Sequence, residues 1–396
     1  MVEQGYGKWI LNASIVFPDE VKRGNIYISE GKIQGIYGEE VSRELIDDKH
    51  EVIDATDMYV LPGLIDIHCD AIEKEVQPRP NTLYPMDLAI YELDKKLAGN
   101  GITTMYQSVS LGVGLSLRGD NLLVNLLENL INYRNQRSMI RHRVHLRYEL
   151  IHLAGIELAN ELIQSGIVDY LSFMNHAPGQ GQYKKPGSFE AYVMKNQGVD
   201  KDEVKKITEN AIKTQESIDW DKVRALAHLA LSQGISIASH DDDSIEKIDE
   251  ALTYGVTVSE FPLNIETAEY AKRSNLLVCV GAPNVVRGVS HDNNLRASDA
   301  IKLGLVDIIC SDYLPSSLLH AVFKLVNENT VSLPKAVNMA SLNPAKAMGI
   351  DKELGSIECG KEADLLLVKI FDGYPFIIKT FVNGKCVYSA DFFHFN

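Results

Sequence analysis

The sequence predicts an α/β fold: a (β/α)8 TIM-like barrel joined to a small β-sandwich domain that is built from both termini. Three features of the 396-residue chain lead to this expectation. Apolar strand-like runs alternate with helix-like runs through the middle of the chain, which is typical of parallel βα units. Eight such strand-like runs can be identified, the number of strands in a closed barrel. The two ends of the chain consist instead of short strand-like runs and turns.

The ends are expected to form one small β domain from residues 1–60 and 356–396. The N-terminal part contains WILNASIVF and GNIYISEGKIQGI, and the C-terminal part contains FIIKTFVNGKCVYS. Within this last run, Asn383 and Gly384 form a strong hairpin-turn signal. Because chain termini often lie close together, we expect strands from both ends to share one domain.

The barrel is expected between residues 61 and 355. A charged, helical segment near 188–231 is longer than one barrel helix needs, so it predicts a helical insertion, either an arm or a lid. In such a barrel the functional residues gather at the C-terminal ends of the strands. The expected strands are residues 64–69, 101–107, 143–149, 168–175, 235–239, 256–261, 276–281 and 306–311.

The composition limits the possible classes of function. The chain has 39 Lys plus Arg against 54 Asp plus Glu, a net charge of −15, which argues against a general nucleic-acid binder. Its 45% apolar and 23% charged residues are those of an ordinary globular protein. With five cysteines, no CxxC pair and no visible secretion signal or membrane span, a cytoplasmic location is expected.

Six titratable side chains stand at the ends of predicted strands. They are His68, Asp70, Glu149, His176, His240 and Asp312. Charged groups at the end of an apolar strand are costly to bury unless they are paired or coordinated. Because imidazole and carboxylate ligands suit Zn²⁺, Mn²⁺ or Fe²⁺, the set predicts a metal site at one rim of the barrel. The alternative is that each residue merely caps a strand or bonds a loop.

Other polar residues are expected to be structural. The run Asp241–Asp243 suggests metal binding as one alternative, but it is expected to cap the helix that follows it. Glu73 is expected to be the ion-pair partner of Lys74. His320 remains a second candidate for the site. The histidines without strand-end placement are expected to be structural or exposed: His142, His145, His152 and His228.

Longer motifs carry a resemblance to a known family. The most specific are NHAPGQGQ at 175–182 and GAPNVVRG at 281–288, accompanied by HCDAIEKEVQPRP at 68–80 and ASHDDD at 238–243. With these motifs and the order His-x-Asp, acid, His, His, Asp, the chain resembles the amidohydrolase superfamily of metal-dependent hydrolases, and within it a branch that acts on phosphonates.

The chain also departs from the usual superfamily pattern. It has Asp70 where a second histidine is common, and Glu149 where a carboxylated lysine is common. His176 and His240 fall on predicted strands four and five, whereas the superfamily ligands usually sit on strands five and six. The number of bound ions therefore stays open.

The resemblance implies a divalent metal cofactor of one or two ions, zinc with manganese or iron as alternatives. The six strand-end residues would be ligands, with Glu149 as the bridge if two ions bind. Asp312 would accept a proton from bound water, whose pKa a divalent ion lowers to ~7. The implied reaction is attack on the α-phosphorus of a ribose methylphosphonate 5-triphosphate, with release of pyrophosphate. The expected partner is thus a small molecule, and a homodimer is possible.

Such an anionic substrate requires local cations, because arginine forks bind phosphate groups bidentately. The candidate substrate-binding residues are Lys74, Arg79, Arg147, Gln180, Gln182, Asn284, Arg287 and His291. Two alternatives stay open. One is a deacetylase or cyclic amidase that acts on a C–N bond and needs fewer cations, and the other is a non-catalytic scaffold.

Overall fold

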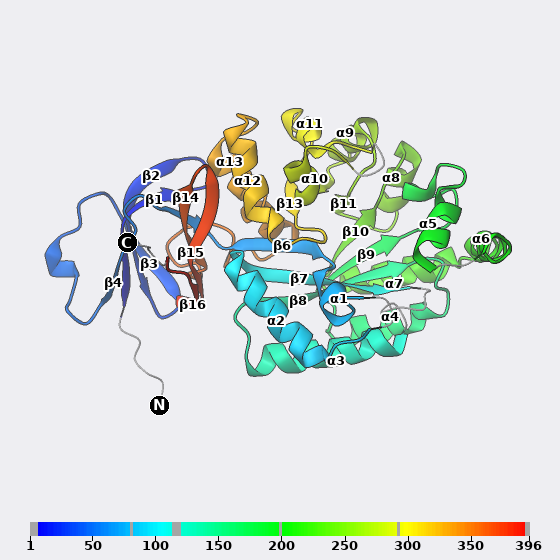
Figure 1. Cartoon of the computed structure of the whole chain (residues 1–396), viewed down its shortest axis with the longest axis horizontal. Helices are drawn as coiled ribbons and strands as arrows, with labels where there is room; N and C mark the ends of the chain where they lie inside the picture. The colour runs from blue at the N-terminus through cyan, green and yellow to red at the C-terminus, as the bar shows by residue number, and fades with distance from the viewer. Residues whose placement is uncertain (1–6, 80–81, 113–119, 198–199, 291–293, 393–396) are drawn as a thin grey trace.

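The computed structural model describes residues 7–79, 82–112, 120–197, 200–290 and 294–392. It consists of a parallel barrel and a separate mixed sheet, which lie side by side in Figure 1. This confirms the predicted fold class. In the described part of the chain, no helix combines the length and the apolar character that a membrane span requires.

The barrel is formed by eight parallel strands that follow one another in chain order. Parallel strands are covered on both faces, and β6 and β7 are accordingly buried along their whole length. All eight strands overlap the predicted ranges. They are β6 (Leu64–Cys69), β7 (Ile102–Leu111), β8 (Arg141–Glu149), β9 (Tyr170–Met174), β10 (Ser236–His240), β11 (Val258–Glu260), β12 (Leu277–Gly281) and β13 (Ile308–Cys310).

The helices that connect these strands, and those that follow the last of them, lie around the outside of the barrel (Figure 1). The longer ones are α2 (Met86–Gly99), α3 (Asp120–Gln136), α4 (Gly155–Gln164), α7 (Trp220–Ser232), α8 (Ile245–Leu252), α9 (Ile265–Arg273) and α12 (Ser317–Asn327). The shorter ones are α1 (Ala71–Val76), α10 (Ala282–Arg287), α11 (Ala297–Lys302), α13 (Leu333–Asn338) and α14 (Leu342–Ala347), with a 3-10 turn at Gly181–Tyr183. Another 3-10 turn, Arg43–Leu45, belongs to the N-terminal part of the chain that forms the second sheet.

The predicted helical segment divides into two parts. The helices α5 (Ser188–Gln197) and α6 (Lys201–Glu216) contact each other, and α6 projects at the edge of the molecule in Figure 1. The next helix, α7, contacts α4 and β10 and therefore belongs to the barrel wall. The helices additional to the barrel are thus α5 and α6.

Strands from both ends of the chain form the second sheet. Its order is β16-β15-β14-β5-β1-β2-β3, with β4 paired to β1. The N- and C-terminal parts join where β5 pairs antiparallel with β14, for example Val60 with Leu367. Its strands are β1 (Lys8–Val16), β2 (Val21–Ser29), β3 (Lys32–Tyr37), β4 (Glu51–Asp54), β5 (Tyr59–Pro62), β14 (Leu365–Phe371), β15 (Tyr374–Val382) and β16 (Lys385–Ser389).

The predicted hairpin turn at Asn383 and Gly384 is confirmed. Both residues have positive φ, 50° and 68°, and they connect β15 to β16. Positive φ at both central positions is what a two-residue hairpin turn of type I′ requires, which explains why Asn followed by Gly stands there.

Candidate metal centre

The ends of the barrel strands surround a cavity of about 320 Å³. Residues that line it include His68 at the end of β6, Arg147 on β8, His240 at the end of β10 and Asp312 just after β13. Four of the six predicted titratable residues, His68, Asp70, His240 and Asp312, therefore line one cavity, whereas Glu149 and His176 do not line it. The cavity lies at the mouth of the barrel, the position at which barrels of this kind hold their functional groups.

Three left-handed backbone turns direct side chains toward this mouth. Asp241, Phe261 and Asp312 have φ of 55°, 58° and 60°, and each follows the end of a strand. Their N–H groups donate to the carbonyl oxygens of Glu260, Cys279 and His68, each at 2.9 Å, on the neighbouring strand. Positive φ is uncommon outside glycine and asparagine and is strained for a bulky residue such as Phe261. Such strain collects at functional sites.

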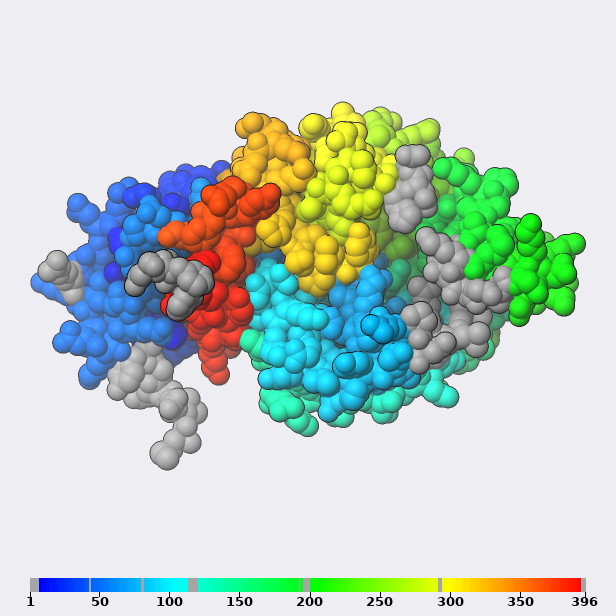
Figure 2. All heavy atoms as spheres, in the orientation of Figure 1, coloured from blue at the N-terminus to red at the C-terminus, as the bar shows by residue number. Residues whose placement is uncertain are grey.

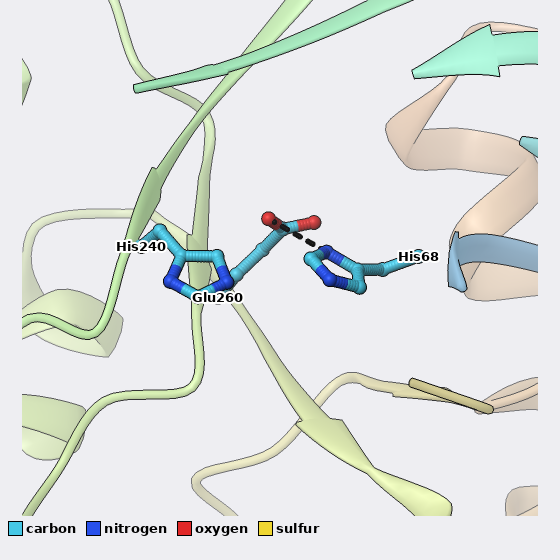
Figure 3. A group of neighbouring side chains, drawn as sticks. All are labelled: His68, His240 and Glu260. Atoms are coloured by element: carbon cyan, nitrogen blue, oxygen red, sulfur yellow. Dashed lines mark ion pairs between the residues drawn. The ribbon is translucent and has the colours of Figure 1, made fainter. Parts of the chain in front are cut away.

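A first group of donors lies deep in the barrel and consists of His68, His240 and Glu260. His68 is 1% exposed and Glu260 is 0% exposed. The Nδ1 atom of His68 lies 3.1 Å from Oε2 of Glu260, and Figure 3 shows the carboxylate between the two imidazole rings. The phenolic O–H of Tyr170 donates to the other oxygen, Oε1, at 3.1 Å.

A second group shares His240 and adds His176 and Asp241. Nδ1 of His240 lies 3.3 Å from Oδ2 of Asp241, and Nε2 of His176 lies 3.8 Å from the same oxygen. Glu149 holds His176 from the other side: its Oε1 accepts the backbone N–H at 3.0 Å, and its Oε2 lies 2.7 Å from Nδ1. Burial opposes the charged form of His176, but Glu149 and Asp241 outweigh it and raise its pKa to about 9.

The donor set fits a divalent cation. Four buried ligand atoms have no hydrogen-bond partner among the described residues: Nδ1 of His68, Oδ1 of Asp70, Nδ1 of His240 and Oε2 of Glu260. Unsatisfied polar atoms in a buried position are costly. Imidazole nitrogens and carboxylate oxygens together are the ligands that Zn²⁺, Mn²⁺ and Fe²⁺ accept.

Asp312 has the properties of a proton acceptor. Burial, with a contribution from the nearby carboxylate of Asp70, raises its pKa to about 7, although Arg147 and Lys74 oppose this shift. A carboxyl group that titrates near neutral pH suits general acid–base work. Gly281 makes room for it, because a Cβ there would lie 3.3 Å from Oδ2 of Asp312.

The predicted substrate-binding residues divide according to their position. Arg147, Gln182, Asn284 and Arg287 line the cavity. Arg147 is only 6% exposed, and its Nη2 donates to Nε2 of His240 at 3.4 Å. Asn284 lines the cavity but also ties a loop, because its side-chain amide bonds the backbone of Leu295 and Ala297 at 2.9 and 3.0 Å.

Lys74, Arg79 and Gln180 do not line the cavity, although Lys74 contacts two residues that do. Lys74 is exposed, lies 3.5 Å from Asp70 and has its ammonium group 4.6 Å from the ring centre of Tyr313. His291 lies outside the described residues.

Two structural expectations were wrong. Asp241–Asp243 do not cap α8, because Ser244 is the N-cap and its side chain accepts the N–H of Lys247. Asp241 instead faces the histidines, and Asp242 accepts hydrogen bonds from the hydroxyls of Ser239 and Ser259.

Glu73 is likewise not the partner of Lys74, because its Oε1 accepts the N–H of Ser110 at 2.9 Å. Glu73 and Asp242 thus accept hydrogen bonds from Ser110 and Ser259, which lie on the barrel strands β7 and β11. The sequence around each carboxylate does not reveal these partners.

The histidines away from the strand ends are mostly structural. His142 binds Asp94 at 3.1 Å and His152 binds Asp120 at 2.8 Å. His145 lies below His68, with ring centres 5.1 Å apart, and both its ring nitrogens contact serine hydroxyls. His320 is exposed, contacts Tyr374 and does not line the cavity.

Sequence reasoning missed Glu260 and Asp241 as members of the site. Glu260 ends β11 just as His240 ends β10, so strand-end position was the signal that could have found it. For Asp241 there was no such signal, because its role depends on the left-handed turn that follows His240.

A parallel barrel whose strand ends bring histidines and carboxylates together defines a hydrolase of the amidohydrolase class. The chain belongs to the amidohydrolase family, whose profile, described as "Amidohydrolase family", matches residues 191–387. It is 33% identical over 386 residues to the α-D-ribose 1-methylphosphonate 5-triphosphate diphosphatase of Escherichia coli K12, covering 96% of this chain and 100% of that protein.

Solved structures with the same fold are more distant. A Xaa-Pro dipeptidase with bound methionine has a TM-score of 0.67 at 17% identity, covering 97% of this chain and 100% of that chain. The N-acetylglucosamine-6-phosphate deacetylase from Pasteurella multocida has a TM-score of 0.63 at 14% identity, covering 96% and 99%. At these identities the likeness shows the fold and not the reaction.

Proposed function

We propose that the chain is a metal-dependent diphosphatase of phosphonate breakdown. Its substrate would be α-D-ribose 1-methylphosphonate 5-triphosphate, the compound in the name of the 33% identical relative. One water molecule is consumed, and the bond breaks between the α-phosphorus and the oxygen that it shares with the β-phosphorus. The products are the 5-phosphate and pyrophosphate.

The observation that carries this proposal is the environment of Arg147. The guanidinium group is 6% exposed and forms no ion pair with a carboxylate of the described chain, although it lines the cavity beside His240. A buried, unpaired cation is costly unless an anion compensates it. A phosphoryl group supplies that anion, and the guanidinium fork matches its geometry.

The same feature argues against the rival reaction. A deacetylase or cyclic amidase reacts at a neutral amide group, so a buried arginine beside His240, at the candidate metal site itself, favours a reacting phosphoryl group over a reacting amide. Arg287 lines the same cavity from α10 and is exposed, which supports a role in binding further phosphate oxygens at the rim. A non-catalytic scaffold is disfavoured because every strand-end position of the predicted set carries a donor.

We assign the metal ligands to the predicted set, with zinc as the first choice and manganese or iron as alternatives. The residues are His68, Asp70, Glu149, His176, His240 and Asp312. A bound divalent ion supplies Lewis acidity and makes water acidic enough to react near neutral pH.

The chain's own residues provide the rest. Asp312 holds the proton that leaves the attacking water, and Arg147 orients the phosphoryl group in the cavity. Glu149 fixes the ring of His176 through Nδ1 and thereby leaves Nε2 facing Asp241.

The test is a direct assay of the purified protein. Incubation with the ribose methylphosphonate 5-triphosphate should release pyrophosphate, seen by phosphorus NMR, and a chelator should stop the release until zinc or manganese is restored. Parallel assays use N-acetylglucosamine 6-phosphate and a dihydropyrimidine. Hydrolysis of either of these, without pyrophosphate release from the triphosphate, would refute the proposal.

A further inference from the structure

Glu260 is a buried carboxylate without a matching cation. Its side chain is fully buried, and none of the ion pairs formed by described lysines or arginines includes it. In the described chain the phenol of Tyr170 and the imidazole of His68 contact it. His240 belongs to the same donor group, and the imidazole of His145 is close enough to interact with its charge. A carboxylate in such a position is costly unless a positive charge compensates it.

The contact between Glu260 and His68 does not have the geometry of a hydrogen bond. Nδ1 and Oε2 are 3.1 Å apart, yet neither atom finds a hydrogen-bond partner. Two ligand atoms bonded to one tetrahedral zinc ion at ~2.0–2.2 Å lie roughly 3.3–3.6 Å from each other. The observed separation is slightly shorter, so a small movement of either side chain would let both lone pairs, which no hydrogen bond uses, converge on a shared ion.

From these observations we propose that Glu260 is a metal ligand together with His68 and His240, and that Tyr170 is the positioning residue that orients it. This rests on the metal dependence of the proposed function and adds a ligand that the six-residue set lacks. Tyr170 donates to Oε1, which leaves Oε2 for the ion.

Tyr170 is well fixed for this role. It is fully buried, and its ring centre lies 4.2 Å from that of His145. His145 is itself held on both sides, because Nδ1 lies 3.0 Å from the hydroxyl of Ser108 and Nε2 lies 2.9 Å from that of Ser172. Ligating carboxylates are generally oriented by such outer hydrogen bonds, and the loss of one typically costs ~10–100-fold in metal affinity.

The experiment measures zinc affinity by competition with a chromophoric chelator, on folded protein and without substrate. Tyr170→Phe removes one hydroxyl and keeps the ring, so we expect zinc to bind about 10-fold more weakly or worse. Glu260→Gln keeps the shape and removes the charge, and its loss should be at least as large. Tyr106→Phe is the matched control, because Tyr106 is 2% exposed in the same interior and, among the described residues, forms no hydrogen bond or ion pair with Glu260.

Wild-type zinc affinity in Tyr170→Phe and in a folded Glu260→Gln would overturn the proposal. If Glu260→Gln does not fold, Tyr170→Phe alone decides, because an apolar isostere is well tolerated in a buried position. A weakening in Tyr106→Phe equal to that in Tyr170→Phe would also count against it. Zinc affinity can be measured without turnover, so the two proposals can fail separately. If the wild-type protein releases no pyrophosphate but the Tyr170 and Glu260 variants bind zinc more weakly, the proposed function is refuted and the ligand assignment stands.

Discussion

The N–H of Asp312 donates to the carbonyl oxygen of His68 at 2.9 Å, so the last barrel strand meets the first one inside the candidate metal centre. A second bond, from the N–H of Asp70 to the carbonyl oxygen of Asp312 at 2.8 Å, completes this junction. Lower down, Ile65 and Ile309 donate instead to Ala340 and Met339. The barrel is therefore closed directly at the site. These hydrogen bonds set the distance between Asp312, after the last strand, and His68 and Asp70, at the end of the first strand.

Replacement of Asp312 by Asn should reduce turnover strongly and largely preserve substrate binding. The amide cannot accept the proton, and loss of a positioned acid–base group typically costs ~10²–10⁴-fold in rate. Steady-state kinetics should show the fall in kcat with KM little changed. Asp299→Asn, an exposed position on α11, is the control and should behave as wild type. Unchanged turnover in Asp312→Asn would remove Asp312 from the mechanism.

The pH dependence of kcat/KM should report the same carboxyl group. Asp312 acts only when ionised, so activity falls as the pH drops through its pKa, which burial raises to about 7. A bound cation favours the ionised form and moves this acidic limb below pH 7. The limb should be missing from the residual activity of Asp312→Asn. A limb that survives the substitution would belong to another group.

Replacement of Arg147 by Met should weaken substrate binding without loss of stability. A hydrogen bond to a charged group contributes roughly 1.5–3 kcal/mol, so KM for the triphosphate should rise about 10- to 100-fold. Because the guanidinium has no carboxylate partner among the described residues, its removal should leave the Tm unchanged or higher. A lower Tm with normal KM would mean that Arg147 is structural. Arg147→Lys should recover part of the affinity, since it keeps the charge but not the fork.

The barrel could be predicted from sequence because strands covered on both faces are continuous apolar runs. Residues 64–69 were expected and observed as a strand, and 306–311 contains the observed β13. The position at a strand end likewise indicated His240 and Asp312 as residues of the cavity. The sequence could not show contacts between residues that lie apart in the chain. Asn284 is occupied by backbone groups 11 and 13 residues away.

Asp241 shows a second limit of the sequence. A run of carboxylates before a helix usually caps it, but the left-handed turn at Asp241 directs this side chain toward His176 and His240. The turn is fixed by the N–H of Asp241 donating to the carbonyl oxygen of Glu260, on a strand that follows later in the chain. No local pattern contains that information.

Asp94 should contribute to stability and not to metal binding. Its buried carboxylate accepts hydrogen bonds from the hydroxyl of Tyr133 at 2.8 Å and the N–H groups of Met139 and Ile140 at 2.7 and 3.2 Å, and it lies 3.1 Å from Nε2 of His142. Breaking such a buried network typically costs about 3–5 kcal/mol. Asp94→Ala should therefore lower the free energy of unfolding by about that amount in urea titrations at pH 7, and zinc affinity should stay at the wild-type value.

The pH dependence of the Asp94 effect follows from its pKa. Burial alone would raise it, but hydrogen bonds from His142, Met139 and Tyr133 outweigh burial and lower the pKa below 3.8. A carboxyl group with a lowered pKa in the folded state stabilises the protein above its unfolded value of ~3.9, and this contribution disappears as the pH falls through the folded pKa. The stability difference between wild type and Asp94→Asn should thus be constant from pH 7 to about pH 5 and shrink below pH 4. A difference that grows toward acid would show that the network does not favour the ionised form.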